Sequence, residues 1–127
     1  MRRAVILIVV LGVLSFGSGL GLDVLQQRTA QKYMQGVETI RQLVIQNDLP
    51  AARREQAHLH ALWQHDARWL NCLISHHHTR AVTSAMLRLS TALDMGWPVQ
   101  ALMALDDAFD ALGDIRTGEF ATLENLL

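Results

Sequence analysis

The chain has 127 residues, enough for one domain and nothing larger. Half of its residues are apolar and its formal net charge is −1, so the composition argues against nucleic acid and against an anionic membrane surface as partners. Cys72 is the single cysteine, which excludes an internal disulfide and a cysteine-based metal site.

An uncharged and strongly apolar run occupies residues 4–22. As a helix it would measure about 28 Å, close to the thickness of the hydrocarbon core of a bilayer. Arg2 and Arg3 precede the run, and Asp23 follows it. The pattern predicts an N-terminal transmembrane helix that inserts in the lipid bilayer as an uncleaved signal anchor. A cleaved signal peptide, with its cleavage site near residues 17–19, is the alternative.

The flanking charges predict an orientation for this anchor. Arg2 and Arg3 are expected to stay in the cytoplasm under the positive-inside rule. Residues 1–22 would then form the membrane anchor, and residues 23–127 a helical domain outside the cytoplasm. The expected location is the cell membrane, as a single-pass protein. Gly17 and Gly21 have the spacing of a close helix–helix contact within the anchor.

After this run the sequence predicts helices throughout, because strand-like alternation is absent. Pro50 and Pro98 both lie where a helix would begin. The segment 51–95 contains neither glycine nor proline, yet a single helix of that length rarely fits a compact domain of this size. We predict a break at residues 64–66, where Asp66 would cap the next helix, with Ser75 as the second choice.

The predicted fold class is therefore all-α: an N-terminal transmembrane helix followed by a small antiparallel bundle of about four helices. The expected helices lie near residues 4–46, 50–64, 66–95 and 98–113, and a short apolar tail covers residues 120–127. Trp63 and Trp69 are expected to point inward. The turn at Leu49-Pro50 is echoed at Trp97-Pro98, so a pair of tetratricopeptide-like helix hairpins is an alternative architecture.

Histidines are the most conspicuous candidates for chemistry. The six are His58, His60, His65, His76, His77 and His78. No two are spaced i, i+3 or i, i+4, the spacing that turns two rings onto one face of a helix. A metal site would need ligands from different helices, so we predict no resident metal and no cofactor. The weak candidates for a metal- or pH-sensing site are His65, His76, His77 and His78.

Acidic residues recur in the last predicted helix, where Asp106, Asp110 and Asp114 share one face. Repeated like charge on one helix face is destabilising. We therefore expect arginines to offset it, the candidates being Arg80, Arg88 and Arg116. The spacing does not match a calcium-binding loop, which favours a solvated acidic face over a cation site.

Several short motifs follow one another along the chain. They are the pair Trp63 and Trp69, the run Leu-Ile-Ser-His-His-His at residues 73–78, Leu-Arg-Leu at residues 87–89, and the ending Leu-Glu-Asn-Leu-Leu at residues 123–127. In this order they resemble the bacterial domain-of-unknown-function family 4363. That family has carboxylates where Ser75, His78 and Arg80 stand here, so a site that relied on those acids would be absent. The resemblance implies a membrane-attached helical protein of bacteria and implies no biochemical activity.

Two features of the sequence bear on function. It has more apolar residues than one buried stripe per helix requires, and it lacks known catalytic motifs. There is no nucleophile elbow, no phosphate-binding glycine loop and no cysteine–histidine arrangement. We predict that the chain is no enzyme but a membrane-tethered helical interaction module at the bacterial cell envelope, which binds a membrane or envelope protein or a second copy of itself. The alternative is a metal- or pH-sensing domain. The candidate interaction residues, centred on the third and fourth helices, are Trp63, Trp69, Met86, Trp97, Met103 and Phe109.

Overall fold

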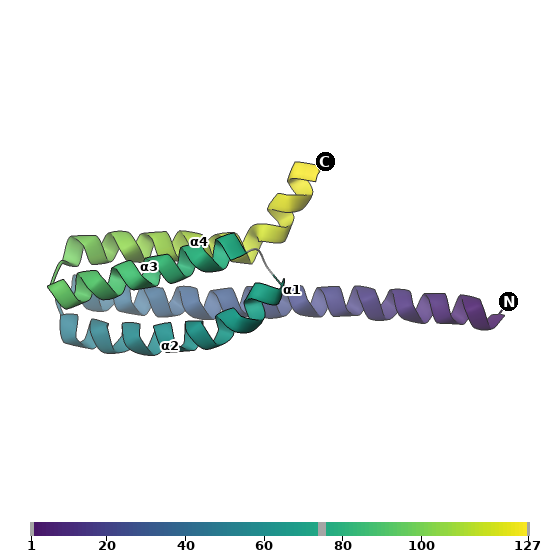
Figure 1. Cartoon of the computed structure of the whole chain (residues 1–127), viewed down its shortest axis with the longest axis horizontal. Coiled ribbons are helices and arrows are strands. Elements are labelled where there is room, and N and C mark those ends of the chain that lie inside the picture. The colour runs from purple at the N-terminus through teal and green to yellow at the C-terminus, as the bar shows by residue number, and fades with distance from the viewer. Residues whose placement is uncertain (1, 74–75, 127) are drawn as a thin grey trace.

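A computed structural model describes the backbone of residues 2–73 and 76–126, and all side chains in these ranges except those of residues 18–20, 22–23, 73, 76 and 118–126. The described chain contains four helices and no strand: α1 (Arg2–Ile45), α2 (Leu49–Leu73), α3 (His76–Met95) and α4 (Pro98–Leu126). Each helix runs antiparallel to the next, and the pairs in contact are α1–α2, α2–α3, α3–α4 and α4–α1 (Figure 1). The predicted all-α antiparallel bundle is confirmed.

Two turns of the same geometry close the bundle at one end. Asn47, between α1 and α2, and Gly96, between α3 and α4, have positive φ angles of 61° and 71°. In each turn the next backbone N–H donates to the carbonyl five residues earlier, at 2.9 and 2.8 Å. This is the pattern that ends helices through a left-handed residue. Asp48 then caps α2 by accepting a hydrogen bond from the N–H of Ala51 at 3.2 Å.

The core is formed by one side of every helix. In α1 the apolar residues at helical spacing, Tyr33, Val37, Ile40 and Val44, are all buried. The indole of Trp63 lies at the centre, meets the ring of Tyr33 edge to face at 5.2 Å between centroids, and donates to Thr83 Oγ1 at 2.9 Å. α4 contributes both large side chains, Leu105, Leu112 and Ile115, and small ones. The buried alanines of α4 are Ala101, Ala104, Ala108 and Ala111.

The predicted break at residues 64–66 is wrong, because α2 continues without interruption to Leu73. Asp66 does not cap a helix. It lies within α2, where its carboxylate accepts hydrogen bonds from side chains of α1 and α2. The second choice, Ser75, lies outside the described residues, which resume at His76 with α3.

The predicted end of the last helix near residue 113 is also wrong, because α4 extends to Leu126. Gly113 lowers helix propensity by about 1 kcal/mol. The buried side chains of Leu112 and Ile115 on either side of it hold the helix against the bundle and outweigh that cost. The apolar side chains of the expected tail, residues 120–127, lie outside what the structure describes.

α1 extends far beyond the bundle. The first buried side chain among those described is that of Gln26, and the backbone of residues 2–25, which we call the arm, projects from the other three helices (Figure 1). Among the described residues, no helix combines the length and the hydropathy that a bilayer crossing requires. The predicted membrane span over residues 4–22 and the predicted location in the cell membrane are therefore contradicted.

The α1–α2 contact gives the first testable prediction. A Cβ atom at Gly36 would lie 2.6 Å from Cδ1 of Leu59, so this glycine lets the two helices approach closely. We expect Gly36→Val to lower the free energy of unfolding by about 1–3 kcal/mol through overpacking, measured by urea denaturation.

Gly113→Val is the matched control, because a Cβ atom at that position meets nothing within 4 Å. It should leave stability unchanged or raise it slightly, since valine is the better helix former. Equal effects of the two substitutions would show that the Gly36–Leu59 approach does not limit packing.

Candidate interaction surface

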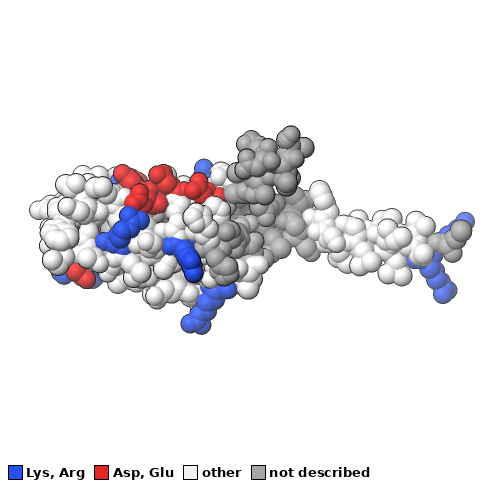
Figure 2. Space-filling view, turned by 45° about the horizontal axis from the view of Figure 1, so that its top comes forward, with Lys and Arg blue, Asp and Glu red and all other residues white. Residues whose placement is uncertain are grey.

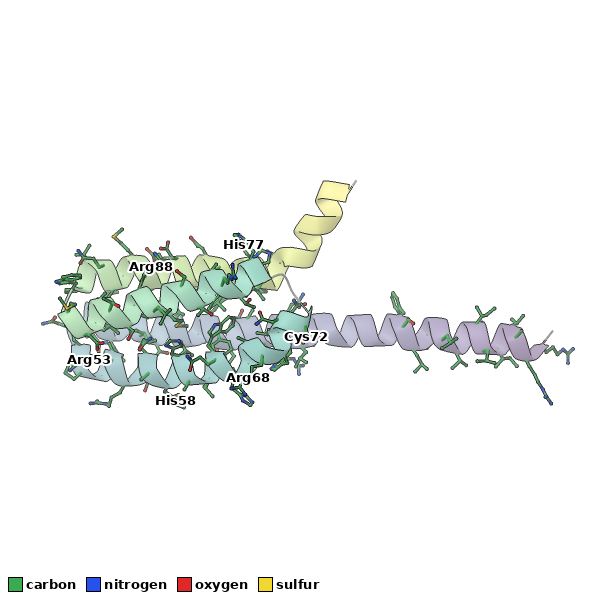
Figure 3. All side chains as sticks on the ribbon, in the orientation of Figure 1. Arg53, His58, Arg68, Cys72, His77 and Arg88 are labelled. Carbon is green, nitrogen blue, oxygen red and sulfur yellow. The ribbon has the colours of Figure 1, made fainter. Side chains whose placement is uncertain are left out.

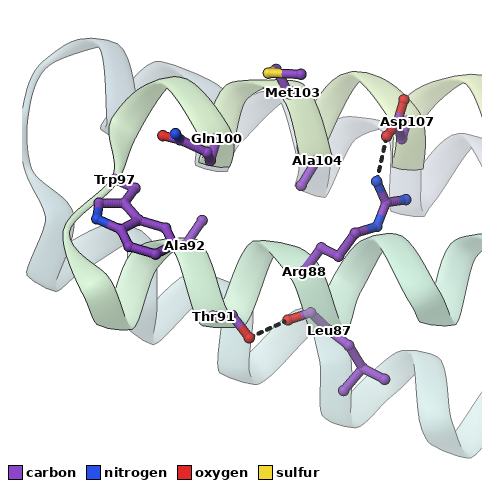
Figure 4. A pocket seen from close by; sticks show the side chains of 9 residues that line it. All are labelled: Leu87, Arg88, Thr91, Ala92, Trp97, Gln100, Met103, Ala104 and Asp107. Carbon is purple, nitrogen blue, oxygen red and sulfur yellow. Dashed lines mark hydrogen bonds and ion pairs between the residues drawn. The ribbon is translucent and has the colours of Figure 1, made fainter.

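A groove of about 440 Å³ lies on the outside of the bundle between α3 and α4. Its floor includes the small side chains of Ala92 and Ala104 (Figure 4). Larger apolar side chains stand beside this floor: Leu87 from α3, Trp97 from the turn, and Met103 from α4. They are 54%, 47% and 61% exposed, respectively. The groove is thus an open apolar surface on an otherwise well-packed bundle.

These large side chains are exposed because the core does not need them. α3 packs against both α2 and α4, and its inner side is already supplied by Val82, Ala85, Met86, Leu89, Ala92 and Leu93. Leu87 points away from that side. Met103 similarly lies between the inward Ala101 and Ala104 of α4. Because burial favours each of them over exposure by about 1.5–3 kcal/mol, contact with a partner would be favourable.

The groove is lined by one charged residue from each helix, Arg88 of α3 and Asp107 of α4. Arg88 bridges one end of the groove by an ion pair with Asp107 at 2.7 Å (Figure 4). Arg41 of α1 pairs with Asp106 at 2.5 Å. Among the side chains that the structure describes, the exposed Asp110 and Asp114 of α4 have no ion pair. Figure 2 shows the resulting acidic surface along the α4 edge of the bundle.

The structure separates the predicted interaction residues into two groups. Trp97 and Met103 line the groove between α3 and α4. Trp63 and Met86 are fully buried, and Trp69 and Phe109 are partly buried against the core. The expected exposure of Met86 is therefore wrong. The wide apolar stripe of α3 does not leave a free surface at that residue, because α3 has two neighbours to cover.

Sequence reasoning missed Leu87 and the alanine floor as parts of this surface. Leu87 falls in the Leu-Arg-Leu run at residues 87–89, whose other leucine is buried. At 100° per residue, neighbours two apart lie on nearly opposite sides of a helix. That spacing therefore signals that only one of the two leucines can face the core.

A second polar feature lies at the α1–α2 contact. Asp66 accepts hydrogen bonds from the hydroxyl of Tyr33 at 2.5 Å, from the ammonium of Lys32 at 3.2 Å and from the indole N–H of Trp69 at 3.4 Å. The Asp66 side chain is mostly buried, whereas the Lys32 side chain is half exposed. All donors come from α1 or from the next turn of α2, so the network joins these two helices.

The network shifts two pKa values in opposite directions. Burial alone would raise the pKa of Asp66, but the hydrogen bonds from Tyr33, Lys32 and Trp69 and the positive charge of Lys32 outweigh it, so that this pKa lies below its usual range. The pKa of Tyr33 is raised, first by burial and then by its hydrogen bond to the Asp66 carboxylate. At neutral pH the pair therefore consists of a charged carboxylate and a neutral phenol.

The histidines do not gather at one place. His58 projects outward from α2, and His77 lies in the first turn of α3 (Figure 3). His65 is also exposed, and His78 is half-buried with its ring 5.7 Å from that of His77. The side chain of His76 lies outside the described residues. Among the side chains that are described, no three histidine, cysteine or acidic groups come together as metal ligands.

The described geometry defines a class of protein: an up-and-down four-helix bundle with an elongated first helix and an open groove between its last two helices. The family described as "Domain of unknown function (DUF4363)" matches residues 24–126. The chain belongs to this family, which confirms the resemblance seen in its motifs. The match begins within the arm and covers the whole bundle. No curated protein and no solved structure matches the chain.

The Asp66 network gives the second testable prediction. Replacement Asp66→Asn should lower the free energy of unfolding at pH 7 by about 1.5–3 kcal/mol, the usual contribution of hydrogen bonds to a charged group. Since the folded-state pKa of Asp66 is below its unfolded value of about 3.9, this stabilisation is present above that pH and is lost as the pH falls through the folded-state pKa. Urea denaturation at several pH values should show the two proteins converging below about pH 4.

Glu55→Gln is the control, because Glu55 is an exposed carboxylate of the same helix. It should change stability little at any of these pH values. A difference between Asp66→Asn and the unmodified chain that persists at low pH would show that the carboxylate charge is not what the network stabilises.

Proposed function

We propose that the chain is a non-catalytic helical interaction module whose α3–α4 groove binds an amphipathic helix of a partner protein. The observation that carries the proposal is the exposure of Leu87, Trp97 and Met103 around one groove, outside a core that is complete without them. Tryptophan and methionine are well suited to such contacts, since one offers a large rigid surface and the other an adaptable one.

The shape of the groove favours a helix as the occupant. Two parallel ridges, from α3 and α4, border a shallow floor of alanines, and a third helix can place its own ridge of side chains between them. Such helix-in-groove binding uses apolar residues at positions i, i+3 or i+4 and i+7 of the partner. Leu87 and Met103 would contact the two sides of that apolar ridge.

The charge around the groove favours a basic partner. Asp110 and Asp114 continue the α4 edge beyond Asp107 and have no ion pair among the described side chains. A helix with lysine or arginine beside its apolar ridge would meet these carboxylates. Complementary charge of this kind raises the association rate and selects among partners more than it raises affinity. A binding role at this groove needs no catalytic group and no metal.

The alternative of a histidine-based sensor has less support. His65 on α2 and the pair His77 and His78 on α3 are not brought together with a third ligand among the described residues. The proposed binding of a helix in the α3–α4 groove therefore involves neither a metal ion nor a histidine switch.

The third testable prediction uses two synthetic helical peptides with leucine at helical spacing, one carrying lysines and the other glutamates at all remaining positions. The full-length chain should bind the lysine peptide, with an affinity that falls as salt rises, and should bind the glutamate peptide at least about tenfold more weakly. Isothermal titration calorimetry measures both affinities.

The double variant Leu87→Gln/Met103→Gln should lose at least about tenfold in affinity for the lysine peptide, because it removes the apolar contacts on both sides of the groove without adding negative charge that would attract lysine. Val99→Gln is the matched control, since Val99 is as exposed as these residues but does not line the groove. Circular dichroism should show all variants folded. Equal affinity of the two peptides, or an equal loss in the control, would contradict the proposal.

A further inference from the structure

A second cleft, of about 440 Å³, lies between α2 and α3, near the end of the bundle that the two turns close. Most of its lining residues are charged or polar, unlike those of the α3–α4 groove. They are Pro50, Arg53, Arg54, Gln56 and Ala57 from α2, and Ser90 and Asp94 from α3. The volume of the cleft lies in the range that small-molecule sites occupy in proteins.

The cleft is part of the packing of α2 against α3. Ala57 and Ser90 have short side chains, so the space between the two helices is left open there. The buried Gln56 donates a hydrogen bond to the carbonyl of Met86 at 3.1 Å and so fixes α2 on α3 beside the opening. A cleft that is already formed requires little rearrangement when a ligand binds.

The charged side chains of the cleft do not neutralise one another. Among the side chains that the structure describes, Arg53, Arg54 and Asp94 take part in no ion pair, although all three line the same cleft. Asp94 also lies in the last turn of α3, where the helix dipole disfavours an acid and where α3 has no basic residue. Its carboxylate therefore does not stabilise the helix that carries it, and it is exposed to a ligand.

We propose that this cleft binds a free acidic α-amino acid, a molecule with two carboxylates and one ammonium group. Two guanidinium groups and one carboxylate line the cleft, so every charge of such a ligand has an opposite charge to meet. Arginine suits the carboxylates, because its planar guanidinium offers parallel N–H donors. The ammonium group pairs with Asp94, and the hydroxyl of Ser90 supplies a further donor or acceptor.

Other acids do not compete for the two arginines within the cleft. Asp48 and Glu55 are the nearest acids in the sequence of α2, and neither lines the cleft. Asp48 instead accepts the capping hydrogen bond from Ala51. The site is also separate from the α3–α4 groove, so it is independent of the binding of a helical partner there.

The test is a titration of the full-length chain at low salt, followed by the backbone amide signals in two-dimensional NMR. L-glutamate should shift the signals of Ala57, Ser90 and Asp94 saturably. Glutarate lacks the ammonium group and L-glutamine lacks one carboxylate, so each should bind at least about threefold more weakly, the usual effect of one exposed ion pair. Absence of saturable shifts, shifts confined to the α3–α4 groove, or equal affinity for the three compounds would overturn the proposal.

Substitutions assign each charge to its partner. Arg53→Gln and Arg54→Gln should each weaken the binding of L-glutamate at least about threefold. Asp94→Asn should abolish the preference for L-glutamate over glutarate, because it removes the group that pairs with the ammonium. Arg68→Gln is the matched control, since Arg68 is an exposed arginine farther along α2 and outside the cleft (Figure 3).

All four side chains are exposed, so circular dichroism should show every variant folded. An equal loss of affinity in Arg68→Gln would show that net charge, rather than the cleft, attracts the ligand. A preference for L-glutamate over glutarate that survives in Asp94→Asn would show that Asp94 does not bind the ammonium group. Either result would overturn the proposal.

Discussion

The close approach of α4 to both of its neighbours is the constraint on which the bundle depends. The distance between packed helices is set by the side chains between them. The inner side of α4 carries four alanines, from Ala101 to Ala111, beside the buried Leu105 and Leu112, and these short side chains let α4 pack against α1 and α3 at once. The same shortness of side chains, at Ala92 and Ala104, leaves the outer side of the α3–α4 seam hollow. The groove is therefore a direct result of how the last two helices pack, and it needs no additional element to form it.

The contacts made by α2 rely on different chemistry. Asp66 joins α2 to α1 through Tyr33 and Lys32, and the buried Gln56 joins α2 to α3 by donating to the carbonyl of Met86 at 3.1 Å. Hydrogen bonds of this kind have one partner at one distance, so they fix the position of α2 along its neighbours more narrowly than apolar contacts do. Small apolar side chains set the separation of α4, whereas buried polar groups set the register of α2.

Most of the fold could be predicted from the sequence, because its signals are local. The apolar spacing in α1, the two prolines at helix starts and the absence of strand patterns all act within a few residues. The failures have a common physical cause, which is that long-range contacts overrode local signals. Asp66 is of a residue type that often caps a helix, yet its hydrogen-bond partners Lys32 and Tyr33 lie on α1, more than thirty residues away. Gly113 is of a residue type that often ends a helix, yet the buried side chain of Ile115 holds α4 against the bundle beyond it. Met86 was expected on the surface because apolar periodicity does not show how many neighbouring helices cover a helix. For the same reason the sequence did not reveal that Leu87 is part of the groove.

The unbroken course of α1 has a mechanical consequence. Its 44 residues form a strut about 66 Å long, and the hydrogen bonds along its backbone resist bending. Roughly half of α1 packs against α2 and α4, and the remainder extends beyond the bundle. A partner that binds the arm near Arg3 therefore fixes the orientation of the bundle. It also fixes the distance between itself and the α3–α4 groove. A flexible linker of equal length would fix neither the orientation nor the distance of the bundle. Because arm and bundle share one continuous helix, α1 acts as a rigid spacer.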